Sequence, residues 1–128
     1  MLEQKEMRAV YCQALMDIAA KDDRIVNVQA DLMAGHGMKP FAEKYPERTF
    51  NVGGAEANMI GVAAGLATTG KIPFAQSFAT FAARRCFDQI AISVCYAKLK
   101  GCIIGSDPGV AAELNGGTHM GVDDIGIM

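Results

Sequence analysis

Short runs of β-branched and apolar residues alternate along this chain with segments whose apolar residues recur at helical spacing. The short runs predict strands, at residues 24–31, 49–52, 71–76 and 101–107. The periodic segments predict helices, at residues 4–20, 40–45, 55–69 and 80–98. Because the connections are short, the crossovers should be right-handed and the sheet mostly parallel. The sequence therefore predicts an α/β fold, doubly wound, with helices on both faces of the sheet.

The length of the chain limits the number of cores. A chain of 128 residues, 51% of them hydrophobic, can surround one core but hardly two. Residues 1–128 are therefore expected to form a single domain. A helix start signal at Asp123 or Asp124 comes close to the last residue, which indicates a domain that is incomplete at its C-terminal end.

Charge and hydropathy exclude two classes of partner. Twelve basic and fourteen acidic residues give a formal net charge of −2, and no run of Lys and Arg could neutralise a row of phosphates. No uncharged run approaches the roughly 20 apolar residues that cross a bilayer. We therefore expect no nucleic acid and no membrane partner, and a soluble, cytoplasmic protein. The four cysteines form no CxxC pair, which is typical of reduced thiols in that compartment.

Two predicted helices lack the polar stripe that a helix on a monomer presents to water. Residues 57–69 carry no charge, and the second half of residues 80–98 carries almost none. A small domain cannot easily bury two helices on all sides, so we expect a substantial subunit interface. The alternative is that alanine and glycine are simply tolerated on an exposed face.

Glu56 is a lone acid in front of thirteen uncharged residues, 57–69, which are followed by Gly70. A carboxylate in the first turn of a helix is favoured by the partial positive charge there, and this structural explanation could suffice. Burial among apolar neighbours, however, disfavours the charged form and suits an acid that shares a proton with a ligand. Glu56 also follows a strand, and ligands gather at the carboxyl ends of parallel strands. The sequence therefore makes Glu56 the leading candidate for a functional residue.

Three ordered motifs carry a resemblance to a known family: NVGGAEANMIGVAAGLA from Asn51, PFAQSFATFAARRCFDQI from Pro73, and GGTHMGVDD from Gly116. Together they resemble the pyrimidine-binding domain of the transketolases, in which a strand leads to a V-G-x-x-E turn and then to S-T-F-x-x-F and G-P-T-H motifs. The likeness covers nearly the whole chain. It is greatest to the C-terminal half of bacterial transketolases that are split into two polypeptides, in a shortened version.

The resemblance implies thiamine diphosphate as the cofactor and gives Glu56 a role. The Glu56 carboxyl would hydrogen-bond the N1′ nitrogen of the aminopyrimidine ring, so that the ring's amino group can take a proton from the thiazolium. Phe81 and Phe78 would form the aromatic wall on which the ring stacks, and Asp31, in QADL, would lie beside the cofactor. Without the resemblance, the two phenylalanines are ordinary core residues and Asp31 caps a turn.

The resemblance also implies contacts with a sugar substrate. His119, in GGTH, matches a histidine that reaches the oxygens of the donor sugar. Arg8 occupies the place of an arginine that holds the sugar phosphate in many transketolases, although an exposed arginine on a first helix is also common. Asn115 replaces an aspartate that helps to select sugar stereochemistry.

Several positions depart from the family pattern. Ser106 and Asp107 stand in GSDPG, where the family often has a histidine. Gly35 and His36 stand where a phosphate-contacting serine is frequent, and Gly117 replaces the proline of G-P-T-H. These departures disfavour a standard ketose phosphate donor, whereas the residues that face the cofactor are intact.

The family holds the diphosphate and its Mg²⁺ or Ca²⁺ in a separate domain, with a G-D-G motif followed by asparagine, and this chain has no such motif. The resemblance therefore implies an N-terminal, diphosphate-binding transketolase subunit as partner, in a homodimer or a heterotetramer. It implies a transferase of carbohydrate metabolism, of the pentose phosphate type, that moves a two-carbon ketol unit from a ketose to an aldose. Sugars or sugar phosphates would be its substrates, and the isolated chain would be inactive.

Two alternatives stay open. The chain could be a non-catalytic assembly module, or an inactive fragment of a transketolase, that keeps the fold and its apolar interface. It could also belong to a related enzyme such as a deoxyxylulose phosphate synthase, to which the RRCFDQ segment shows some likeness.

Overall fold

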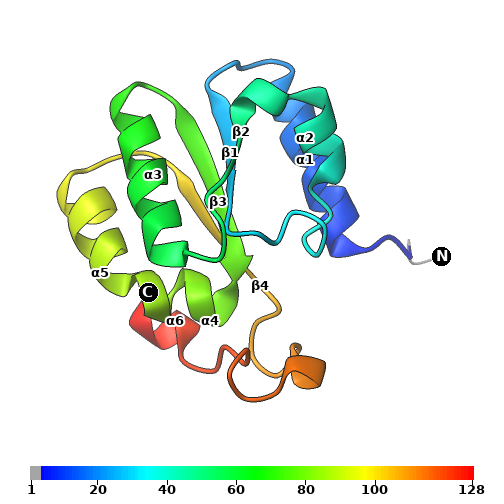
Figure 1. The fold of residues 1–128 in the computed structure, drawn as a ribbon, viewed down its shortest axis with the longest axis vertical. Helices are drawn as coiled ribbons and strands as arrows, with labels where there is room; N and C mark the ends of the chain where they lie inside the picture. Colours follow the sequence, from blue (N-terminus) through cyan, green and yellow to red (C-terminus); the bar gives the residue numbers. More distant parts are fainter. Residues whose placement is uncertain (1–3) are drawn as a thin grey trace.

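A computed structural model describes residues 4–128, in which a parallel sheet lies between two layers of helices (Figure 1). The strands are β1 (Ile25–Gln29), β2 (Thr49–Asn51), β3 (Ile72–Phe78) and β4 (Cys102–Ser106). They pair in the order β2-β1-β3-β4, and each pair is parallel. The predicted α/β fold is therefore confirmed.

Helices cover both faces of the sheet (Figure 1). On one face lie α1 (Met7–Ala19) and α2 (Lys39–Lys44), and on the other lie α3 (Glu56–Thr68) and the helical segment that follows β3. The buried residues of α1 recur at helical spacing, as the sequence predicts, and are Cys12, Leu15 and Ala19. The remaining short elements are η1 (Pro46–Arg48), η4 (Glu113–Asn115) and α6 (Asp124–Ile127). None of the described helices has the length and apolar character that a membrane span requires.

The continuous helix expected over residues 80–98 is wrong in detail. The segment consists of α4 (Ala79–Ala82), the 3-10 turn η2 (Arg84–Cys86), α5 (Phe87–Gln89) and the π-helical η3 (Ile90–Tyr96). The break falls at Ala83, whose ψ of −79° lies beyond the usual helical range. Apolar periodicity does not reveal such changes of hydrogen-bond spacing, because all three helix types bury one side against the sheet.

The alternation of side chains along the strands divides the core into two clusters. Ile25 of β1 packs with α1 and α2, whereas Val28 packs with α3. On β3, Phe74 packs with the cluster of α1 and α2, and Ala75 packs with the cluster of α3. Continued to the end of β3, this alternation sends neighbouring side chains to opposite faces of the sheet.

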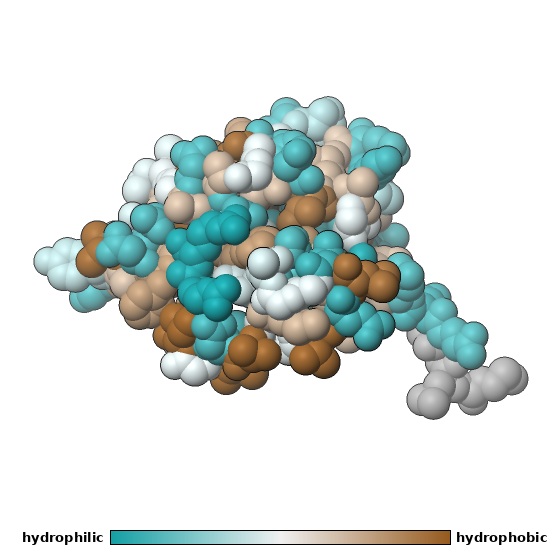
Figure 2. Space-filling view, turned by 60° about the horizontal axis from the view of Figure 1, so that its bottom comes forward, coloured by the Kyte–Doolittle hydropathy of each residue, from teal (hydrophilic) through white to brown (hydrophobic). Residues whose placement is uncertain are grey.

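The strand order creates a switch point at one end of the sheet. From β1 the chain passes to β2 on one side, and from β2 it crosses to β3 on the other side of β1. In open α/β sheets, ligands bind at the carboxyl ends of the strands beside such a point. Figure 2 faces this end of the molecule, over which hydrophilic and hydrophobic side chains are intermixed.

The two helices expected to be buried on all sides are partly exposed in the chain by itself. One stripe of α3 is open, at Asn58, Gly61, Gly65 and Thr68. Ile92 and Tyr96 of η3 are exposed as well. The subunit interface therefore stays a prediction, and these exposed stripes are the surfaces that it would cover.

Candidate functional site

Glu56 begins α3 and is buried, with 4% of its surface exposed. The Ser77 hydroxyl donates a hydrogen bond to Oε1 at 3.0 Å, and Arg85 Nη1 donates to Oε2 at 2.6 Å. Both carboxylate oxygens are thus paired, as a buried charge requires. The start of a helix adds a favourable partial positive charge. The prediction of a buried acid at a strand's carboxyl end holds, and its two partners come from β3 and from η2.

Arg85 connects this acid to an aromatic cluster. The Arg85 guanidinium lies over the Phe81 ring, with 3.9 Å from its carbon to the ring centroid. The Phe81 ring meets His119 edge-on at 4.9 Å and Phe78 at 5.9 Å, and Phe78 meets His119 at 5.3 Å. Four predicted site residues are thus connected: Phe78, Phe81 and His119 through their rings, and Glu56 through Arg85, which was not predicted.

A cavity of about 260 Å³ adjoins this cluster at Phe78. Its lining includes two further predicted residues, Arg8 and Asn115. The charged side chains around it are those of Arg8, Asp107 and Glu113. The cavity thus combines one cation, two acids and the edge of the aromatic cluster, and it is large enough for a small sugar.

Arg8 is held by groups within the chain. Its Nη1 donates to the Gly35 carbonyl oxygen at 2.6 Å, and its Nη2 donates to Asp107 Oδ1 at 2.9 Å. Asp107 adopts a left-handed backbone, with φ of +51°, directly after β4. The carboxylate that this turn aims at Arg8 offsets part of the positive charge that the arginine could offer to an anion.

His36 is the centre of a buried polar network on the α1 side of the sheet. The Gln29 amide donates its two hydrogens to Asn27 Oδ1 and Gln76 Oε1, so Gln29 Oε1 faces His36 Nδ1 at 3.3 Å. His36 Nδ1 must therefore carry a proton, and Nε2 forms a hydrogen bond of 3.0 Å with the Ser106 hydroxyl. Burial and the nearby Arg8 charge lower the pKa of His36 to about 4, although Asp107 acts in the opposite direction. The imidazole is consequently neutral at physiological pH.

Asp31 forms two hydrogen bonds with Asn51 of β2. Its backbone N–H donates to Asn51 Oδ1 at 2.9 Å, and its carboxylate accepts from Asn51 Nδ2 at 3.3 Å. Its φ of +60° is unusual for a residue other than glycine and is tolerated best by Asp and Asn. Asp31 thus ties the end of β1 to the end of β2. Its expected place beside the cofactor stays a prediction.

Cys86 lies directly behind the aromatic cluster and its thiol donates to the Phe81 carbonyl oxygen at 3.1 Å. Burial and the Glu56 charge raise the pKa of Cys86 to about 11, and Arg85 opposes this shift. A thiol with so high a pKa is not a nucleophile at neutral pH. Cys86 therefore serves to pack η2 against the sheet.

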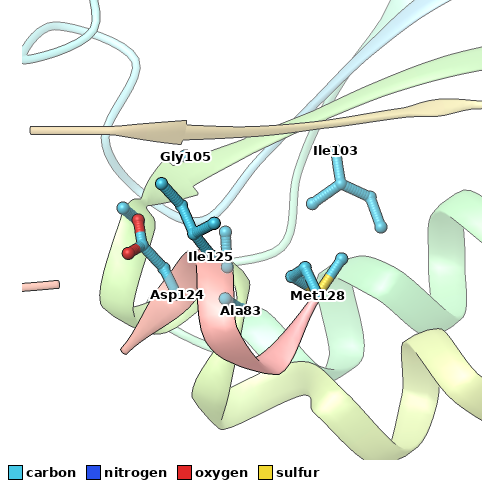
Figure 3. A pocket seen from close by; sticks show the side chains of 8 residues that line it. Ala83, Ile103, Gly105, Asp124, Ile125 and Met128 are labelled. Atoms are coloured by element: carbon cyan, nitrogen blue, oxygen red, sulfur yellow. The ribbon is translucent and has the colours of Figure 1, made fainter. Parts of the chain in front are cut away.

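A second cavity, of about 200 Å³, lies between α4, β4 and α6 (Figure 3). Its labelled side chains include Ile103, Ile125 and Met128, with Asp124 at its margin. This lining is mainly apolar and contains no residue of the Glu56 cluster. Within residues 4–128, no three His, Cys, Asp or Glu side chains come together in a way that could hold a metal ion.

The family model described as transketolase, pyrimidine binding domain, matches residues 3–128. The chain belongs to this transketolase family. A 6-deoxy-6-sulfo-D-fructose transketolase subunit of Clostridium sp. strain MSTE9 is 56% identical over 127 residues, which are 99% of this chain and 39% of that protein. A Methanocaldococcus jannaschii protein named as a transketolase C-terminal section is 44% identical, over 97% of this chain and 39% of that protein.

A solved structure agrees with these relatives. The structure titled as a split gene transketolase, inactive beta4 tetramer, superposes with a TM-score of 0.79 at 43% identity, over 94% of this chain and 38% of that one. A 1-deoxy-D-xylulose-5-phosphate synthase of Thermomicrobium roseum is 42% identical, over 91% of this chain and 18% of that protein. The chain thus spans about two fifths of the length of these two transketolase relatives.

Sequence reasoning missed the residues that hold the predicted ones. Ser77 and Arg85 pair with Glu56, yet the sequence singled out RRCFDQ only through its likeness to a deoxyxylulose phosphate synthase. His36 and Ser106 were noted as separate departures from the transketolase pattern, and the structure joins them in one hydrogen bond. Two positions that depart together from the transketolase pattern can do so because their side chains touch, and this signal could have suggested the contact.

Proposed function

We propose that this transketolase-family chain supplies the pyrimidine-binding half of a thiamine diphosphate site, in an enzyme that moves a two-carbon ketol unit from a ketose to an aldose. The observation that carries the proposal is the buried Glu56 carboxylate, which bonds to Ser77 near the carboxyl end of β3 and is bridged to the Phe81 ring by Arg85. An acid shielded from water next to a flat aromatic face suits a planar, nitrogen-containing ring that shares a proton with it.

The residues present fit such a ring. The Arg85 guanidinium is itself planar and rich in N–H donors, and it reaches both Glu56 Oε2 and the Phe81 face. A flat cation with N–H donors is therefore accommodated between this acid and this ring. Glu56 would hold the proton at the ring nitrogen, and Phe81 and Phe78 would orient the ring. When bound, thiamine diphosphate supplies the carbon nucleophile and electron sink that ketol transfer requires.

A partner chain is part of the proposal. The names of similar proteins describe a transketolase subunit, a C-terminal section and a split gene transketolase, which supports an N-terminal subunit as partner. That subunit would bind the diphosphate and its Mg²⁺ or Ca²⁺. A homodimer or heterotetramer would then bring the two halves of each site together, with the exposed stripes of α3 and η3 as the contact surfaces.

We infer that the donor sugar binds in the cavity of about 260 Å³. The end of the sugar that lies near Arg8 would carry a group with a single charge. His119, next to Phe78, would contact its oxygens, and Asn115 and Arg8 its far end. The carboxylates of Asp107 and Glu113 repel a phosphate more strongly than a sulfonate. A phosphate carries about 1.5 to 2 negative charges at neutral pH, whereas a sulfonate carries one. The 6-deoxy-6-sulfo-D-fructose in the name of one relative carries a group of this kind.

The deciding experiment combines the chain with a candidate N-terminal subunit, thiamine diphosphate and Mg²⁺, and measures two-carbon transfer. Loss of a proton-sharing group costs roughly 100-fold or more in rate, so Glu56→Gln should abolish most activity while assembly is retained. Glu43→Gln, on the exposed side of α2, is the matched control and should leave the rate unchanged. Equal activity of Glu56→Gln and the original chain would end the catalytic assignment and leave an assembly module.

A deoxyxylulose phosphate synthase is the second candidate, favoured by the 42% identity to the Thermomicrobium roseum enzyme. The same assembly can be tested with pyruvate and an aldose phosphate, with release of carbon dioxide as the readout. Turnover of pyruvate without ketol transfer would replace the transketolase proposal with this one.

A further inference from the structure

Arg85 makes two contacts that lie at the centre of the candidate site. It donates to Glu56 Oε2 at 2.6 Å, and its guanidinium covers the Phe81 ring at 3.9 Å. These are the two partners that the proposed function gives to the pyrimidine ring: a carboxylate that bonds to a ring nitrogen, and an aromatic face on which the ring stacks. One side chain therefore uses both of them at once.

The guanidinium shares its chemistry with a protonated aminopyrimidine. Both groups are flat and cationic, both carry N–H donors in the plane of the group, and both stack on aromatic rings. We propose that Arg85 is an internal competitor of the pyrimidine ring, which occupies the Glu56 and Phe81 positions in the isolated chain and must turn away when the cofactor binds. This inference rests on the proposed function.

The packing indicates which partner would move. The side chain of Glu56 is 4% exposed and is also held by Ser77, whereas that of Arg85 is 49% exposed. Arg85 belongs to the short 3-10 turn η2, which interrupts the α-helical hydrogen bonding between α4 and α5. The exposed Asp88, three residues further on, offers a carboxylate within reach of the same turn. Arg85 can therefore leave the site by side-chain rotation, while Glu56 stays in place.

The electrostatics determine whether removal of Arg85 should tighten or weaken cofactor binding. If Arg85 competes for Glu56, its removal leaves a buried carboxylate without its cation, and a bound ring that shares a proton restores the pairing. Cofactor binding should then become tighter. If Arg85 instead stays on Glu56 and orients it in the loaded site, its removal should weaken binding. The two roles thus predict opposite changes in the dissociation constant.

The test measures binding of thiamine diphosphate, in the presence of Mg²⁺ and without substrate, by calorimetry on the chain assembled with its N-terminal subunit. Arg85→Met should lower the dissociation constant at least fivefold and speed association. Arg85→Lys keeps the charge but loses the planar stack. Its dissociation constant should lie between those of the original chain and Arg85→Met. Arg84→Met is the matched control, because Arg84 pairs with Asp123 instead, and it should bind as the original chain does.

The outcomes separate this inference from the proposed function. If the original assembly binds no thiamine diphosphate, the proposed function fails and the competitor role falls with it. If the original assembly binds, and Arg85→Met binds equally or more weakly, the competitor role alone is overturned. If Arg85→Met does not fold, Arg85→Lys decides, since tighter binding than the original supports competition and unchanged or weaker binding refutes it.

Discussion

His36 and Ser106 are joined by a hydrogen bond of 3.0 Å between Nε2 and Oγ, although 70 residues separate them in the sequence. The bond links the loop after β1 to the end of β4, and His36 lines the cavity of about 260 Å³ together with Arg8 and Asp107. The imidazole is neutral because burial lowers the pKa of His36 to about 4, and with the one ring proton on Nδ1, Nε2 accepts from the Ser106 hydroxyl. His36 therefore contributes no charge to the proposed sugar site, whose charged side chains are those of Arg8, Asp107 and Glu113.

The neutral state of His36 should make the stability of the chain depend on pH. Burial lowers the pKa of His36 from 6.5 to about 4 in the folded chain. Between these values the unfolded chain binds more protons, so the free energy of unfolding should fall as pH drops from about 6.5 to 4, by at most about 3 kcal/mol. Urea unfolding at pH 7 and pH 5 measures this loss. His36→Gln should flatten it, and an identical pH dependence in that variant would contradict the assignment.

The pairing of Arg8 with Asp107 should control preference for the charge of the substrate. Asp107→Asn keeps a hydrogen-bond acceptor at 2.9 Å from Arg8 but removes the charge that offsets it. We expect kcat/KM for a phosphate-bearing donor to rise severalfold relative to a sulfonate-bearing one. Asp123→Asn, which affects the Arg84 pair outside the cavity, is the control. An unchanged ratio in Asp107→Asn would show that Asp107 does not set the preference.

Close packing of β4 against α4 makes Gly105 irreplaceable. A Cβ at this position would lie 2.8 Å from the Ala79 Cα, a backbone atom that cannot yield easily. Gly105→Ala should therefore destabilise the chain by about 1 to 3 kcal/mol. Gly61, in α3, meets nothing within 4 Å, and Gly61→Ala should instead stabilise by about 0.5 to 1 kcal/mol. Thermal unfolding of both variants tests the pair, and equal shifts in the same direction would refute the close approach.

The cysteines should differ sharply in reactivity. Cys95 and Cys102 are exposed, whereas Cys12 and Cys86 are buried and burial raises the pKa of both buried thiols. At pH 8, Ellman's reagent should titrate two thiols quickly in the folded chain and four after denaturation. Rapid loss of a third thiol would mean that η2 or α1 opens easily, which would argue against the rigid packing behind Phe81.

Part of the candidate site was predictable because it follows from local order. Glu56 stands alone before an apolar helix and after a strand, so its burial and its place at the sheet edge could be inferred. Phe78, Phe81 and His119 follow in motifs whose order matches the transketolase family, and the rings do come together. What motifs could not provide is the arginine that joins them, since nothing local distinguishes Arg85 from Arg84.

The sequence by itself determined the layers of this protein. Apolar periodicity reports which side of an element is buried, and the alternation of elements with short connections leaves few topologies other than a parallel sheet covered on both faces. Tertiary structure decided which polar groups meet. Glu56 and Arg85 are 29 residues apart, and Arg8 and Asp107 are 99 apart. Such pairs depend on the relative placement of separate elements, and on the direction of each side chain, neither of which is contained in any local pattern.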